Sequence, residues 1–185
     1  MSEYLVTINE LKSIANSIRN KTNTSNQLTF PNEFISGINN IPDIEIYSYI
    51  NGNLSEIYNS EITSLTDYIF AYHFNLTTAS FPSCTSIGSY AFFNCTSLTT
   101  VSFPSCTSIE GYAFGNCYNL TSLNLTGISQ IPSLPYSTAF SSTPIGGYTT
   151  STGGVYGSIY VPSSLYDAFT SATNWTYFSS RIVGV

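Results

Sequence analysis

Four cysteines and one histidine are the residues of this chain whose types suit metal binding, redox or nucleophilic chemistry. Cys84, Cys95, Cys106 and Cys117 follow one another at intervals of 11 residues. Zinc sites use closely spaced ligand pairs such as Cys-x2-Cys, and the sequence contains none. His73 belongs to no Ser-His-Asp or Cys-His arrangement that the sequence supports. We therefore expect no catalytic residues, no metal site and no cofactor.

The cysteines belong to an internal repeat of 22 residues. The phrase "SFPSCTSIGSYAFFNC" at 80–95 returns as "SFPSCTSIEGYAFGNC" at 102–117. Stacking the chain at this period produces apolar columns, among them Ile62, Cys84, Cys106 and Ile128; Leu65, Ile87, Ile109 and Ile131; Phe70, Phe92 and Phe114; and His73, Cys95 and Cys117. Cysteines that share a column with isoleucines are expected to act as small buried hydrophobes. A disulfide between coils is the alternative, because coils stack about 4.8 Å apart, within the range that a disulfide spans.

Each repeat is expected to contain a short strand and a short helical segment. Apolar residues alternate with polar ones at Val101 and Phe103, and Pro104 then ends the strand. In "SIGSYAFFNCTSL", at 86–98, apolar residues recur at intervals of three and four, which predicts a 3₁₀ or α-helical segment. Since one repeat cannot bury its apolar face alone, the sequence predicts an α+β repeat solenoid.

The solenoid is expected to span residues 43–185 in three parts. Residues 43–61 form a front cap, drawn as a hairpin around Asn51-Gly52, and residues 62–140 carry the 22-residue repeats. Residues 141–185 form an irregular C-terminal cap, in which "SIYVP" at 158–162 resumes the strand pattern. The expected cap helix has Ser163 or Ser164 as N-cap and Leu165, Ala168, Phe169 and Ala172 on one face, and Trp175, Phe178 and Ile182 are expected to seal the last coil.

Residues 1–42 are a separate segment, expected to be helical. Its apolar residues are too few for an independent core, so the segment should attach the chain to a partner, to copies of itself or to the first coil. The attachment candidates are Leu11, Ile14, Ile18, Phe30 and Phe34.

Composition excludes several kinds of partner. Charged residues make up 8% of the chain, and residues 22–185 hold one arginine against eight acidic residues, a net charge of −7. Nucleic acids and anionic membrane surfaces need clustered lysine and arginine, so neither is expected as a partner. No apolar run reaches the length of a membrane span, and the N-terminus lacks the features of a secretory signal. We therefore expect synthesis in a host cytoplasm and release by lysis or within a particle.

The repeat "CTSLTTVSFPSCTSIEGYAFGNC", at 95–117, resembles the BspA-like leucine-rich repeat family, whose units carry a paired Ala-Phe followed by a cysteine. The resemblance covers about residues 57–140, with Ala-Phe at 91–92 and 113–114. Members of this family are surface and secreted adhesins of bacteria and phage-encoded proteins. The resemblance implies a leucine-rich-repeat solenoid with a role in binding surfaces.

The N-terminus carries a second resemblance. The stretch "LKSIANSIRNKTNTSNQLTFPNEFISGINNI" is similar to a short module near the start of phage and prophage tail-associated proteins, through Ile18-Arg19, Lys21, Leu28, Phe30-Pro31 and Phe34. It implies that residues 1–42 bind other virion proteins.

These features lead to two hypotheses for function. The first is a bacteriophage virion structural protein, placed in a tail, baseplate or capsid, that displays its repeats to a glycan or protein of the host surface. The second is a bacterial cell-surface or secreted adhesin of the BspA-like kind. An enzyme is not expected, because no pair of the ten acidic residues recurs and only Glu110 lies in a full repeat.

Ligand contacts are expected where the repeats differ from one another. The regular column of Tyr68, Tyr90 and Tyr112 is interpreted as packing. The variable columns supply the candidates Tyr72, Phe74, Phe93, Asn94, Asn116 and Tyr118.

Overall fold

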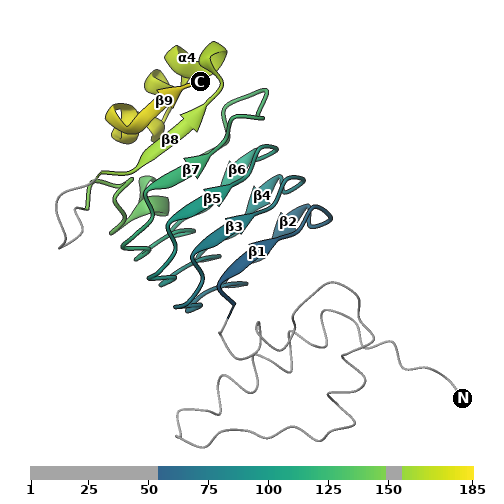
Figure 1. Ribbon diagram of the computed structural model, residues 1–185. Coiled ribbons are helices and arrows are strands. Elements are labelled where there is room, and N and C mark those ends of the chain that lie inside the picture. The colour runs from purple at the N-terminus through teal and green to yellow at the C-terminus, as the bar shows by residue number, and fades with distance from the viewer. Residues whose placement is uncertain (1–53, 149–155) are drawn as a thin grey trace, which may run out of the picture. The chain divides into compact units, whose positions relative to one another are not determined.

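The computed structural model describes residues 54–148 and 156–185, which form a stack of coils with parallel strands (Figure 1). A coil here means one passage of the chain through the stack. Six strands form the larger sheet in the order β1-β3-β5-β7-β8-β9, and every neighbouring pair is parallel. The strands are β1 (Glu56–Tyr58), β3 (Thr78–Ser80), β5 (Thr100–Ser102), β7 (Ser122–Asn124), β8 (Ser158–Val161) and β9 (Ile182–Gly184).

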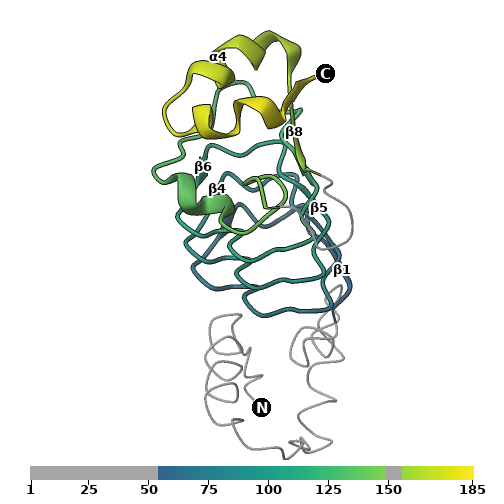
Figure 2. The same cartoon turned by 90° about the vertical axis from the view of Figure 1, so that its left-hand side faces the viewer.

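A second, smaller sheet runs along the other side of the coils (Figure 2). It consists of β2 (Ser64–Leu65), β4 (Ser86–Ile87) and β6 (Ser108–Ile109), again in parallel. In both sheets each residue pairs with the residue 22 positions later, as Ala79 does with Val101 and Leu65 with Ile87. The 22-residue columns and the strand around Val101 are thereby confirmed, whereas the second sheet was missed.

The helical segment predicted within each repeat is wrong. In 86–98, Ser86 and Ile87 are strand β4, and the following residues form turns in which Tyr90 and Asn94 have left-handed backbones, with φ of 58° and 63°. A left-handed residue in every fourth position stops the i→i−4 ladder of a helix. The backbone N–H groups of Tyr90, Phe92 and Asn94 donate instead to carbonyls of the next coil.

The 22-residue period ends before residue 140. Ser108 forms a bridge with Ser133, 25 residues later, and Phe114 N–H donates to Ala139 O. Ile128 keeps its predicted column, but Leu134, rather than Ile131, takes the buried place after Ile109. Three additional residues in the fourth coil cause the shift, and an isoleucine happens to stand at the 22-residue distance.

At the front of the stack, β1 is a parallel neighbour of β3 and so part of the larger sheet. The Asn51-Gly52 turn of the predicted hairpin lies outside the described residues. So do the segment 1–42 and its attachment candidates.

At the end of the stack, β8 resumes the strand pattern as predicted, with Ile159 beside Leu123. The 3₁₀ helix η2 (Ser163–Leu165) precedes α4 (Tyr166–Ser171), so the α-helix begins later than expected and neither serine caps it. Of the predicted apolar face only Phe169 is buried, because a helix this short turns few residues inward. Trp175, Phe178 and Ile182 are buried as predicted, the first two in the 3₁₀ helix η3 (Trp175–Arg181).

Columns of phenylalanine rings form the core of the coils. Phe92 stacks between Phe70 and Phe114, with ring centroids 5.2 and 5.3 Å apart, and Phe140 in the 3₁₀ helix η1 (Ser137–Phe140) continues the column at 5.6 Å. Burying each such side chain contributes about 1.5–3 kcal/mol. A repeat that stacks identical residues therefore builds its own core.

Candidate recognition surface

His73, Cys95 and Cys117 lie inside the coils and saturate backbone carbonyls. His73 is 2% exposed, with Nδ1 3.0 Å from Phe70 O, so it is fully rather than half buried. The Cys95 thiol donates to the same carbonyl at 3.0 Å, and the Cys117 thiol donates to Phe92 O at 3.1 Å. Thr143 Oγ1 donates to Phe140 O at 2.7 Å in the equivalent place of the longer coil. This column therefore serves the core and is closed to substrates.

The thiols are also chemically quiet. All four cysteines are free and buried. Burial raises the pKa of Cys84 and raises the pKa of Cys106 to about 12. Burial and the neighbouring Cys95 thiol raise the pKa of Cys117 well above its ordinary value. At neutral pH these groups stay protonated, and a protonated thiol is a poor nucleophile.

Three tyrosines form a stacked row on the outside of the turns. Tyr90 stacks against Tyr68 and Tyr112 with centroids 4.8 and 5.1 Å apart and planes within 8° of parallel. Tyr68 is 50% exposed and Tyr112 is 36% exposed. The expected packing role is thus packing of the tyrosines on one another at the surface, outside the core.

All three tyrosines have left-handed backbones, with φ between 55° and 59°. This conformation costs a bulky residue about 1–2 kcal/mol, whereas glycine and asparagine adopt it readily. Stacking returns about 0.5–1.5 kcal/mol per ring pair, so the row offsets its own backbone strain.

Three of the predicted ligand-contact residues meet beside this row. Tyr72 lies edge-to-face against Phe93 and Phe74, with centroids 5.8 and 6.2 Å apart, and Phe93 lies edge-to-face against Tyr90 at 5.2 Å. Tyr72 and Phe74 are about half exposed. Gly115 leaves the space for Phe93, since a Cβ at Gly115 would lie 2.9 Å from Phe93 Cδ2. We call Tyr68, Tyr72, Phe74, Tyr90, Phe93 and Tyr112 the aromatic surface.

The other predicted ligand-contact residues lie apart from this cluster or have a backbone role. Asn94 and Asn116 are half-buried and left-handed, with φ of 63° and 60°, the conformation that asparagine tolerates well. Tyr72 occupies the equivalent position with φ 65°. Tyr118 packs against Tyr148, with centroids 5.6 Å apart. Variation in the Tyr72 column therefore reflects a backbone requirement as well as surface chemistry.

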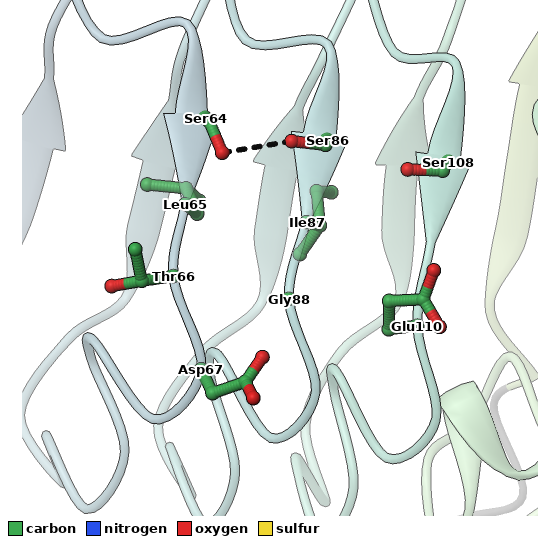
Figure 3. A pocket seen from close by; sticks show the side chains of 9 residues that line it. All are labelled: Ser64, Leu65, Thr66, Asp67, Ser86, Ile87, Gly88, Ser108 and Glu110. Atoms are coloured by element: carbon green, nitrogen blue, oxygen red, sulfur yellow. Dashed lines mark hydrogen bonds between the residues drawn. The ribbon is translucent and has the colours of Figure 1, made fainter.

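A shallow groove crosses the outer face of the smaller sheet, just before the tyrosine row in each coil. It encloses about 520 Å³ and runs over β2, β4 and β6. Figure 3 shows Ser64, Ser86 and Ser108 side by side, with Ser86 Oγ donating to Ser64 Oγ at 2.8 Å. Asp67 and Glu110 lie farther along the same face. We call this the serine groove.

The sequence analysis missed the serine groove. Its signal was the alternation of Ser64, Ser86 and Ser108 with the buried residues Leu65, Ile87 and Ile109, but "SI" is too short to indicate a strand by itself. Glu110 was noted only as an isolated acid. Asp67, whose Oδ1 accepts the Ser89 N–H at 2.8 Å, joins it through the stacking of coils.

Positive charge is nearly absent around these surfaces. Among the described residues the one lysine or arginine is Arg181, whose guanidinium lies 3.7 Å from the centre of the Tyr156 ring. Within 54–148 and 156–185, no group of three or more His, Cys, Asp and Glu side chains is arranged to hold a metal ion. The described part of the chain contains no helix long and apolar enough to cross a membrane.

Comparison with protein families gives one match. The model described as BspA type leucine rich repeat region fits the chain in six copies, over residues 3–121 and 32–145. No curated protein matches the chain.

Proposed function

The chain belongs to the BspA type leucine-rich repeat family, and from this premise we propose that it is a surface-recognition protein of the adhesin type. It binds a ligand on a cell surface or matrix through side chains on the outside of its coils. The aromatic surface is the observation that carries the proposal. The repeats hold six aromatic rings together there, three of them on backbones that cost free energy.

Exposed aromatic rings suit recognition for a physical reason. Tyrosine and phenylalanine have few rotatable bonds, so they supply a large contact area at a small loss of conformational entropy. Edge-to-face contacts with Phe93 fix the Tyr72 ring, while about half of its surface remains exposed. Such a preorganised cluster loses little freedom when it binds.

We propose no catalytic role for the chain. The buried His73 has no access to a substrate, and the raised thiol pKa values of Cys106 and Cys117 disfavour nucleophilic chemistry. Recognition without turnover accounts for the exposed aromatic and hydroxyl groups.

A virion protein is the second candidate, and the N-terminal motif supports it. Ile18-Arg19, Phe30-Pro31 and Phe34 are similar to a module of phage tail-associated proteins. In this version residues 1–42 attach the chain to other virion proteins, or to copies of itself, and the repeats bind a glycan or protein of the host surface. The recognition chemistry is the same in both versions, and only the carrier differs.

Immunogold labelling with an antibody against the full chain distinguishes the two carriers. For an adhesin we expect label on intact producing cells and none on purified phage particles. Label confined to particles would assign the virion role. Binding of the fluorescent full chain to intact bacteria, host cells and extracellular matrix tests recognition itself, and no binding to any of these would contradict the proposed function.

A further inference from the structure

We propose that the serine groove binds an extended, uncharged β-linked glycan chain that crosses the coils at one sugar unit per coil. The inference rests on the proposed recognition function and names its ligand class. Figure 3 displays the row of Ser64, Ser86 and Ser108, with Asp67 and Glu110 on the same face.

The direction and spacing of the groove carry the first step. The groove is lined by residues of three successive coils, so an occupant lies across the coils. The stacked rings of Tyr68, Tyr90 and Tyr112 mark the rise between coils as 4.8 and 5.1 Å. One pyranose ring in an extended β-linked chain advances by nearly this distance, so each sugar meets the same set of groups.

An extended peptide fits this spacing less well. A strand rises about 3.3 Å per residue and repeats its side-chain direction every second residue, at about 6.6 Å. Neither distance matches the rise between coils. A peptide across the groove would therefore move out of register with the serine row within two coils.

The chemistry of the groove carries the second step. Serine hydroxyls both donate and accept hydrogen bonds, and carboxylates accept them, which together suits the hydroxyl groups of a sugar. Asp67 keeps acceptor capacity beyond the bond from Ser89 N–H, since a carboxylate has two oxygens. With two carboxylates and Arg181 as the one cationic side chain of the described residues, the groove disfavours anionic polysaccharides.

An aromatic ring borders the groove beside Glu110. A Cβ built on Gly111 would lie 3.2 Å from Cδ2 of Tyr136, whose side chain is 59% exposed. Sugar rings present C–H patches that pack on aromatic faces, so Tyr136 offers a contact for the terminal sugar.

Calorimetric titration of the full chain with defined hexasaccharides tests the inference. We expect β-1,4-linked glucose or N-acetylglucosamine hexamers to bind, and the α-1,4-linked glucose hexamer, which is curved, to bind at least tenfold more weakly. Thr66 lines the groove, so Thr66→Trp should reduce the affinity for the β-linked hexamer at least tenfold. Thr100→Trp, on the exposed face of β5 in the other sheet, is the matched control and should bind within twofold of wild type.

Ser108→Ala provides a second variant that removes a groove hydroxyl without adding bulk, and it should weaken binding severalfold. Thermal unfolding checks that each variant folds. No binding of either β-linked hexamer, equal binding of the α-linked hexamer, or unchanged affinity in both groove variants would overturn the inference. Continued binding of the chain to cells in any of these cases would leave the proposed recognition function standing and assign it to another ligand, such as a protein.

Discussion

Tyr68 and Tyr90 stack face to face, with ring centroids 4.8 Å apart and planes within 1° of parallel, although both residues hold left-handed backbones. Backbone strain and ring stacking therefore oppose each other at the same positions. The aromatic surface exists because the stacking term is the larger one for residues inside the row.

Replacing Tyr90 by asparagine should destabilise the chain, whereas replacing Tyr68 should not. Tyr90 contacts the rings of Tyr68, Tyr112 and Phe93, and losing three pairs costs about 1.5–4.5 kcal/mol, against about 1 kcal/mol of strain relieved. Tyr68 has one of these partners and is half exposed, so Tyr68→Asn should change the free energy of unfolding by less than about 0.5 kcal/mol.

Denaturant unfolding of both variants measures this difference, with Tyr90→Phe as the control that keeps the stacking. Equal destabilisation by Tyr68→Asn and Tyr90→Asn would show that the row is not held by its internal stacking.

The four thiols should be unreactive in the folded chain and all available after unfolding. They are buried and free, and protonation suppresses their reaction with thiol reagents. A thiol assay on protein purified without reductant should therefore count four groups in denaturant and none in the first minutes without it. A count of two or none in denaturant would reveal disulfides between coils.

Alkaline conditions should destabilise the chain through Cys106. The pKa of its thiol rises from 9.0 to about 12 on folding, so above pH 9 the unfolded chain loses this proton while the folded chain keeps it. Stability is then complete below pH 9 and falls by about 1.4 kcal/mol per pH unit up to about pH 12.

Urea unfolding of wild type and Cys106→Val at pH 8, 9, 10 and 11 isolates this thiol from other ionising groups. Valine should lessen the decline by that slope. Parallel stability curves for the two proteins would contradict the assignment.

The sequence predicted the columns of the fold because identical residues at a fixed period must stack on themselves. It predicted Phe92 and Leu98 as interior, Val101 as a strand residue and Trp175 as a seal, and all are so placed. It failed in the turn around Tyr90, since the spacing of apolar residues in a series of left-handed turns imitates that of a helix. It also failed at Ile131, where a short insertion displaced the column.

Of the candidate site, the sequence located the aromatic residues Tyr72, Phe74 and Phe93 but not their contact with the tyrosine row. The variable columns were informative because the core admits little variation. The serine groove escaped prediction because its residues come together only when three two-residue strands align.

Equilibrium binding of the full chain to the cells or matrix that retain it, measured with an altered aromatic surface, tests the recognition account most directly. Tyr72→Asn with Phe74→Thr gives the first coil the residues that the second coil carries at Asn94 and Thr96, so the fold should persist. Tyr58→Ser with Tyr177→Ser, which removes two tyrosines that are more than 70% exposed elsewhere, is the matched control. We predict at least tenfold weaker binding for the first pair and less than a twofold change for the second; equal affinity of both variants and wild type would contradict recognition through the aromatic surface.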